Sequence, residues 1–148
     1  MIVISDMTTN AHQSITSPKS GTSSDRHRIL IIDDEPAILF AYRKLIEKEG
    51  MCVDSCTCLD GAVRHIRERQ YLAVITDVRL AGTYNEDGLE FLRILREVHP
   101  ATKMILATGH GSSEIKKTAR DMGVSHYFEK PVLPALIMGA LRGFCHQA

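Results

Sequence analysis

The chain has 148 residues, which is enough for one ordinary domain and not comfortably enough for two. Its 18 Lys and Arg residues balance 18 Asp and Glu residues, so no net charge draws the molecule toward nucleic acid or an anionic membrane. No apolar run approaches the roughly 18 residues of a membrane-spanning helix, and the opening Met1–Met7 lacks the basic region of a signal peptide.

The first 27 residues differ in composition from the rest of the chain. Thr8–Asp25 is rich in Ser and Thr and offers almost no apolar side chains to bury. Such a segment cannot offset the entropy that is lost when a chain becomes ordered. We therefore expect residues 1–27 to be a flexible tail and residues 28–148 to form the folded domain.

From Arg28 onward, strand-like and helix-like segments alternate. The predicted strands are short apolar runs, and the predicted helices repeat apolar residues along one stripe. Pro36 suits the first position of a helix, and Gly50 suits the end of one. In chain order, the sequence predicts strands at Ile29–Ile32, Met51–Thr57, Leu72–Thr76, Lys103–Thr108 and Ser125–Glu129, with helices from Pro36 to Gly50, at about Gly61–Arg69, and at Leu89–His99, Ser113–Met122 and Leu133–Cys145.

This alternation predicts an α/β fold, with a doubly wound five-stranded parallel sheet of the flavodoxin-like (βα)₅ type. In such a sheet the carboxyl ends of the strands form one edge, and ligands bind there.

Polar residues stand at the predicted strand ends. They are Asp33 and Asp34 after the first strand, Asp77 after the third, Thr108 at the end of the fourth, and Glu129 and Lys130 at the end of the fifth. Carboxylates brought together repel one another unless a cation intervenes, and oxygen ligands of this kind select a hard cation such as Mg²⁺. A divalent ion at this edge could neutralise an incoming phosphoryl group.

Taken singly, most of these residues also have a structural explanation. Asp34 or Glu35 could cap the helix that begins at Pro36, and Lys130 could be a solvated surface charge. Asp77 is harder to explain in this way, because a charge at the end of a buried strand is costly unless it is paired or bound to metal. The joint occurrence of these residues favours a functional site.

Five motifs follow one another in a recognisable order. They are Ile29-Leu30-Ile31-Ile32-Asp33-Asp34-Glu35-Pro36, the Asp77 that follows Leu72–Thr76, Asp87-Gly88-Leu89-Glu90, Thr108-Gly109-His110-Gly111 and Lys130-Pro131. Together they resemble the receiver domain of two-component response regulators, of the chemotaxis type. The resemblance covers about Arg28 to Cys145 and implies a phosphoaspartate on a (βα)₅ fold.

The resemblance also implies roles for residues near the acidic edge. Asp77 would accept the phosphoryl group. Asp34 would contact Mg²⁺ directly, Asp33 would act mainly through water, and the backbone carbonyl of Arg79 would be a further metal ligand.

Three more residues match positions that bind phosphate or report the switch. Lys130 and Thr108 would bind the phosphoryl oxygens. Tyr127 would change rotamer as Thr108 moves, altering the face formed by the helix at 113–122, the strand at 125–129 and the last helix. The alternative for Tyr127 is a half-buried strand aromatic whose hydroxyl lies in water.

The function that the resemblance implies is phosphorelay signalling. The chain would accept a phosphoryl group from a histidine kinase or phosphotransfer protein, assist its own phosphorylation and dephosphorylation, and switch partner binding, without being an enzyme. The alternative is a Mg²⁺-dependent phosphohydrolase with Asp77 as nucleophile, but such enzymes usually carry Asp where this chain has Arg79. A degenerate receiver or a flavin-type binding module is disfavoured, because the acidic set is complete and no phosphate-cradling Gly-rich loop follows a strand.

Two segments depart from the family pattern. Val78–Gly88 looks longer than usual and lacks the proline expected after the acceptor, and Arg79 lies where family side chains influence attacking water. The last helix carries Ala135, Gly139 and Gly143 at four-residue steps, which permits close helix approach. We expect it to contact a downstream protein effector or a second copy of the chain, although one side could simply pack on the sheet.

No output module is visible after the last helix, so the chain either acts alone through a partner or is a receiver cut from a longer regulator. The basic residues show no recognition-helix pattern, so direct nucleic-acid binding is not expected. His110 and His126 are expected to be loop and strand-edge residues without a function.

The cysteines predict a reduced, cytoplasmic protein. Cys52, Cys56 and Cys58 would lie on one side of a single strand, where a disulfide network is awkward, and they lack zinc-type spacing. We expect them to pack in the core near Val53.

Overall fold

The computed structural model describes residues 27–80 and 86–147. The predicted tail up to residue 26 and part of the long segment after Asp77, residues 81–85, lie outside the described residues. The elements are, in chain order, β1 (Arg28–Ile32), α2 (Pro36–Lys48), β2 (Cys52–Cys56), α3 (Leu59–Glu68), β3 (Ala73–Thr76), α4 (Asp87–Val98), β4 (Lys103–Thr108), α5 (Ser113–Asp121), β5 (His126–Glu129) and α6 (Pro134–Gln147).

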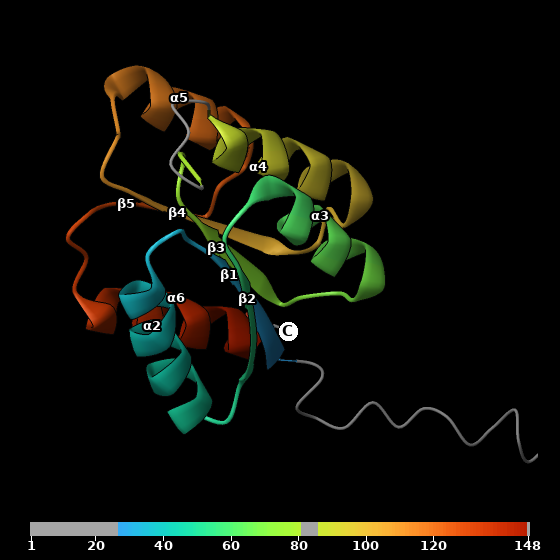
Figure 1. Ribbon diagram of the computed structural model, residues 1–148, viewed down its shortest axis with the longest axis vertical. Helices are drawn as coiled ribbons and strands as arrows, with labels where there is room; N and C mark the ends of the chain where they lie inside the picture. The colour runs from blue at the N-terminus through green and yellow to red at the C-terminus, as the bar shows by residue number, and fades with distance from the viewer. Residues whose placement is uncertain (1–26, 81–85, 148) are drawn as a thin grey trace, which may run out of the picture.

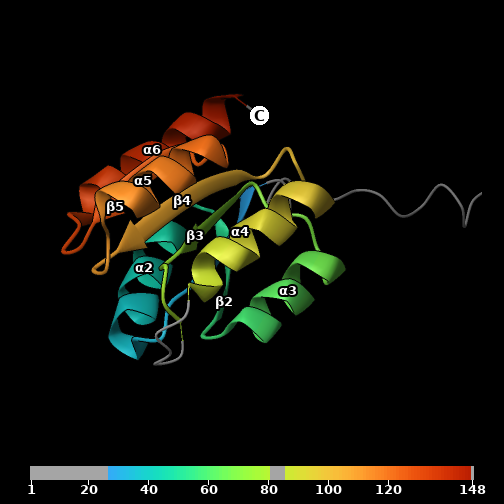
Figure 2. The same cartoon turned by 90° about the horizontal axis from the view of Figure 1, so that it is seen from above.

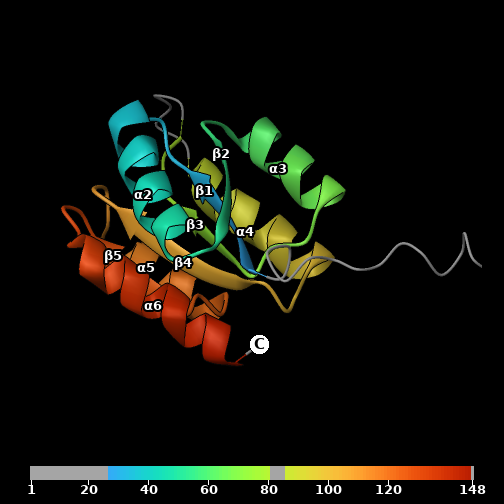
Figure 3. The ribbon, with the colours of Figure 1, turned by 90° about the horizontal axis from the view of Figure 1, so that it is seen from below.

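The strands form one parallel sheet in the order β2-β1-β3-β4-β5. Helices α2 and α6 cover one face of this sheet, and α3, α4 and α5 cover the other (Figures 1 and 2). Figure 3 gives the view from below, in which α2 and α6 lie in front of the strands. The predicted doubly wound α/β fold is confirmed.

Two apolar cores fill the layers, because successive side chains of a strand point to opposite faces. In β1, Ile29 and Ile31 pack with α2 and α6, whereas Leu30 and Ile32 pack with the other three helices. Both faces of β1 are therefore buried, which explains its uninterrupted apolar run.

In the described part of the chain, no helix combines the length and apolar character needed to cross a bilayer.

The element boundaries differ from the prediction by one or two residues at several ends. Helices α3 and α4 each begin two residues earlier than predicted, so Gly61 and Gly88 lie within their first turns. Helix α6 begins at Pro134, a residue that is favoured in a first turn. Gly50 has a φ of +86°, the left-handed conformation expected of a residue that ends a helix.

The cysteine prediction was partly wrong. Cys56 packs against the core beneath α3 and α4, whereas Val53 points to the opposite face, because the two residues are three apart on β2. Cys58 lies beyond the strand and is the N-cap residue of α3. All four cysteines are free thiols, as expected.

The last helix has two different sides. Ile137, Leu141 and Phe144 are buried against the sheet. On the other side, a side chain added at Gly139 or Gly143 would meet nothing within 4 Å. The small-residue stripe therefore faces outward, and what covers it stays a prediction.

Helix α4 approaches the end of β3 so closely that only glycine fits at its first turn. A Cβ added to Gly88 would lie 1.7 Å from the backbone oxygen of Asp77 and 3.0 Å from the Cα of Val78. The Gly88 amide donates a hydrogen bond to the carbonyl of Val78 at 2.8 Å. This contact fixes the backbone that carries Asp77.

Gly88→Ala should therefore destabilise the fold by about 3 kcal/mol, because the added methyl group overlaps the Asp77 carbonyl and one of the two backbone segments must shift. Gly139→Ala is the matched control, since its methyl group points into open space and alanine favours a helix. Urea unfolding of both variants measures the difference. Equal midpoints for the two would contradict the close approach.

Candidate functional site

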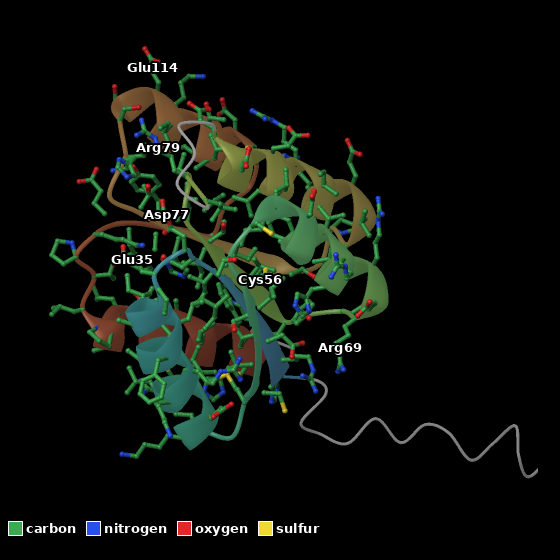
Figure 4. The ribbon with its side chains drawn as sticks, in the orientation of Figure 1. Glu35, Cys56, Arg69, Asp77, Arg79 and Glu114 are labelled. Atoms are coloured by element: carbon green, nitrogen blue, oxygen red, sulfur yellow. The ribbon has the colours of Figure 1, made fainter. Side chains whose placement is uncertain are left out.

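Four strand ends supply the site at the carboxyl edge of the sheet. Asp33 follows β1, Asp77 follows β3, Thr108 ends β4 and Lys130 follows β5. Asp33 and Asp77 are 4% and 6% exposed, and Thr108 is fully buried. In Figure 4, Asp77 lies near Glu35 and Arg79 at this edge. The predicted convergence of these strand ends is present.

Lys130 connects two of the buried carboxylates. Its Nζ donates hydrogen bonds to Asp33 Oδ2 at 2.5 Å and to Asp77 Oδ2 at 2.9 Å. Burial by itself lowers the pKa of Lys130, but the hydrogen bonds to Asp33 and Asp77 outweigh it and raise the pKa above its usual value. Lys130 is therefore a stable ammonium, and the alternative of a solvated surface charge is wrong.

Backbone hydrogen bonds fix where the acidic residues stand. The amide of Asp33 donates to the carbonyl of Cys56 at 3.2 Å, and the amide of Asp77 donates to the carbonyl of Ile32 at 3.3 Å. The Arg79 amide lies 3.4 Å from Asp77 Oδ1, at the long end of the range for a hydrogen bond. The backbone that carries each carboxylate is thus held by a neighbouring strand.

A second acidic group borders this pair. Carboxylate oxygens of Asp33, Asp34 and Glu35 lie within 4.8 Å of one another, and Asp34 and Glu35 are exposed. Glu35 is the N-cap residue of α2, but its side chain makes no capping hydrogen bond; instead its amide donates to Asp33 Oδ1 at 3.0 Å. The capping alternative is therefore wrong for Glu35, whose side chain joins the acidic group.

Glu35 is a candidate ligand that the sequence prediction did not include. The signal was present in the run Asp33-Asp34-Glu35, but the sequence does not tell which of the three side chains turn toward one another. Asp33, Asp34, Glu35 and Asp77 carry four negative charges, and Lys130 supplies one positive charge. The excess of carboxylate oxygens is the donor chemistry that hard divalent cations prefer. Asp77 and the Arg79 carbonyl as metal ligands stay predictions.

Thr108 and Tyr127 meet beside the loop that follows β4. The Thr108 hydroxyl accepts a hydrogen bond from the His110 amide at 3.0 Å. A Cβ added to Gly111 would lie 2.0 Å from the Tyr127 hydroxyl and 3.5 Å from the Thr108 methyl group. The Tyr127 hydroxyl therefore fills the space in front of Gly111.

The Tyr127 hydroxyl is buried without a hydrogen-bond partner among the described residues. Burial, followed by the nearby charge of Glu129, raises the pKa of Tyr127, so the hydroxyl stays protonated. The alternative of a hydroxyl in water is thus wrong. An unpaired buried hydroxyl costs about 1–3 kcal/mol, and the role of Tyr127 as a switch residue stays a prediction.

The two histidines that the sequence singled out lie on the surface. His110 is exposed in the loop after β4, and exposed His126 stacks on Phe128 with 5.8 Å between ring centroids. They occupy the loop and strand-edge positions that the sequence indicated.

Comparisons with known proteins agree on one family. The family model of the response regulator receiver domain matches residues 29–142. The chain is 35% identical over 105 residues to the nitrogen assimilation regulatory protein NtrX of Azorhizobium caulinodans, a match that covers 71% of this chain and 23% of that protein. The chain therefore spans less than a quarter of the length of this relative.

Solved receiver domains match over most of their length. A CheY-like response regulator receiver domain protein from Methanospirillum hungatei is 27% identical with a TM-score of 0.73, and the match covers 83% of this chain and 99% of that one. The beryllofluoride-activated NtrC4 receiver domain dimer is 26% identical with a TM-score of 0.73, and the match covers 81% of this chain and 97% of that one.

Replacing Lys130 with Met should lower the free energy of unfolding by about 3 kcal/mol, because two buried carboxylates lose their counter-charge. Lys117→Met is the control, since the pair that Lys117 forms with Asp121 is well exposed and should contribute less than about 1 kcal/mol. Urea unfolding in the presence of a metal chelator measures both.

The pH dependence gives a second readout. Because the pKa of Lys130 is raised in the folded state, its contribution is complete below the ordinary lysine value of 10.5 and is lost as the pH rises through the raised value. The wild-type advantage over Lys130→Met should therefore shrink only in strongly alkaline solution. An equal loss in both lysine variants at neutral pH would contradict the central role of Lys130.

Proposed function

The chain belongs to the response regulator receiver domain family, and from this membership we propose that it is a phosphoacceptor switch of a two-component system. It takes a phosphoryl group from a histidine kinase or a phosphotransfer protein onto Asp77. The observation that carries this proposal is the pairing of buried Asp77 with the Lys130 ammonium, 2.9 Å away, at the carboxyl edge of the sheet.

Mg²⁺ fits the residues at this edge. The carboxylates of Asp33, Asp34 and Glu35 gather within 4.8 Å, and one ammonium cannot balance them together with Asp77. We propose that Asp34, Asp77 and the Arg79 carbonyl hold the ion, with Asp33 acting mainly through water and Glu35 as a further candidate ligand. When bound, the ion neutralises charge on the transferring phosphoryl group.

The protein groups position the reactants. A carboxylate is a weak nucleophile, so alignment and charge stabilisation must supply most of the rate. A carboxylate oxygen of Asp77 attacks phosphorus, the bond from phosphorus to the donor nitrogen breaks, and an acyl phosphate forms. The Lys130 ammonium, which already contacts Asp77, is placed to hold the phosphoryl oxygens as their charge develops.

Phosphorylation of Asp77 changes the surface through movements of Thr108 and Tyr127. A phosphoryl group on Asp77 offers new hydrogen-bond acceptors, toward which the Thr108 hydroxyl moves from its contact with the His110 amide. That movement changes the space in front of Gly111 that the Tyr127 hydroxyl fills. The surface of α5, β5 and α6 then presents a different shape to a partner.

Two surfaces fit the proposed partners. A groove of about 510 Å³, lined by Ile38, Tyr42, Pro131 and Val132, lies beside Lys130 and is open to a phosphodonor protein. The outward small-residue side of α6 is available to an effector or a second copy of the chain, and the similar NtrC4 receiver is described as a dimer. A cytoplasmic location and the absence of direct nucleic-acid binding stay predictions.

The acceptor assignment is tested by incubating the chain with acetyl phosphate and Mg²⁺. Intact mass should show one phosphoryl group per chain, and Asp77→Asn should abolish the adduct because the amide is not a nucleophile. Asp60→Asn is the control, since Asp60 is an exposed carboxylate on α3. An adduct that survives in Asp77→Asn would overturn the assignment, and steady hydrolysis of small phosphate esters would favour the phosphohydrolase alternative.

Arg79 should set the lifetime of the phosphate. Its amide lies next to the Asp77 carboxylate, so its side chain begins beside the path by which water attacks the acyl phosphate. We expect Arg79→Met to change the autodephosphorylation rate at least about threefold, which corresponds to the net contribution of one polar contact. Loss of the mass adduct with time measures this rate. An unchanged half-life would remove Arg79 from hydrolysis while leaving the acceptor in place.

A further inference from the structure

Two cysteine side chains meet where β2 turns into α3. Cys56 ends the strand and Cys58 is the N-cap residue of the helix. A Cβ added to Gly61 would lie 3.6 Å from the Cys58 sulfur and 3.8 Å from the Cys56 sulfur. Both sulfur atoms therefore lie close to one point, in space that the missing side chain of Gly61 leaves open.

Both cysteines are accessible to solvent, but their surroundings differ. Both residues are partly exposed and both are free thiols. Burial, followed by the proximity of Cys58, raises the pKa of Cys56 to about 12, so Cys56 is protonated at neutral pH. Cys56 packs against the core, whereas Cys58 lies beyond the strand at the N-cap of α3, so an oxidant from solvent reaches Cys58 first and Cys56 is positioned to react second.

We propose that Cys56 and Cys58 form a reversible dithiol–disulfide pair that reacts with peroxide. The Cys58 sulfur attacks one peroxide oxygen, the oxygen–oxygen bond breaks, and the products are a sulfenic acid and water. The Cys56 sulfur then attacks the Cys58 sulfur, the sulfur–oxygen bond breaks, and the Cys56 proton leaves with the hydroxyl as water. A dithiol reductant reverses the reaction by thiol–disulfide exchange.

Closing this disulfide constrains the chain at Thr57. Residues two apart in an extended chain have Cα atoms about 6.6 Å apart, whereas disulfides most often join Cα atoms about 5.5–6 Å apart. The bond therefore favours a shorter separation between the end of β2 and the start of α3. The same backbone holds the acidic site, because the Cys56 carbonyl accepts the hydrogen bond from the Asp33 amide at 3.2 Å.

Oxidation thereby reaches the phosphoacceptor site. Strand β1 lies between β2 and β3 in the sheet, so Cys56 and Asp77 flank the end of β1 from opposite sides (Figure 4). A shift of the Cys56 carbonyl displaces Asp33, which shares Lys130 with Asp77. This coupling, unlike the disulfide itself, rests on the proposed function.

A variant lacking the other thiols isolates the pair. Cys52 and Cys145 are replaced by Ser so that only Cys56 and Cys58 can react. Cys145 lies on the opposite face of the sheet, with its sulfur 3.9 Å from that of Met51. This double variant is treated with hydrogen peroxide, and free thiols, intact mass and linked peptides are measured. We expect both thiols to disappear with the loss of two hydrogen atoms from the monomer and to return after reduction. Cys58→Ser in the same background should leave the Cys56 thiol unmodified under these conditions.

Phosphorylation by acetyl phosphate and Mg²⁺ is then compared in the oxidised and reduced double variant. We expect oxidation to slow adduct formation about three- to tenfold, the effect of losing one hydrogen bond, and reduction to restore it. Two retained thiols, a stable sulfenic acid or a disulfide between two chains would overturn the dithiol assignment. A monomeric disulfide with unchanged phosphorylation would overturn the coupling. If the reduced protein takes up no phosphate, the proposed function fails, whereas the mass measurement still decides whether the disulfide forms.

Discussion

The contact of one ammonium group with two buried carboxylates organises the carboxyl edge of this sheet. Lys130 reaches Asp33 and Asp77 from a third strand end, so the loops after β1, β3 and β5 are held by a single cation. The contact satisfies the carboxylates without neutralising them, because Asp34 and Glu35 add further negative charge beside it. The ion pair thus leaves an excess of carboxylate oxygens at this edge, and these are the ligands that hard divalent cations prefer.

Backbone packing places these charges as much as electrostatics does. The Gly88 amide and the missing Gly88 side chain let α4 lie against the carbonyl of Asp77. Gly111 likewise gives the Tyr127 hydroxyl its space beside Thr108. In both places the missing side chain of a glycine leaves room for a group of the site: the Asp77 carbonyl beside Gly88 and the Tyr127 hydroxyl beside Gly111.

The sheet and most of the site were predictable from the sequence because both follow from periodicity. Apolar runs such as Ile29–Ile32 mark the strands, and in a parallel sheet the residues after each run share one edge. Side-chain direction was harder to predict. The sequence allows Glu35 to cap a helix, Cys56 to pack near Val53 and the Tyr127 hydroxyl to lie in water. The structure differs at all three, because each depends on tertiary packing that a local pattern does not encode.

The Tyr127 hydroxyl, which has no hydrogen-bond partner in the part of the chain that the structure describes, bears on signalling at rest. A penalty of about 1–3 kcal/mol is comparable to the gap between conformers that coexist at percent levels. In the proposed switch, we therefore expect both side-chain positions to be populated before phosphate arrives. Some unphosphorylated molecules would then already hold Tyr127 in the other position. Phosphorylation would change the ratio of the two Tyr127 conformers and would not create a new one.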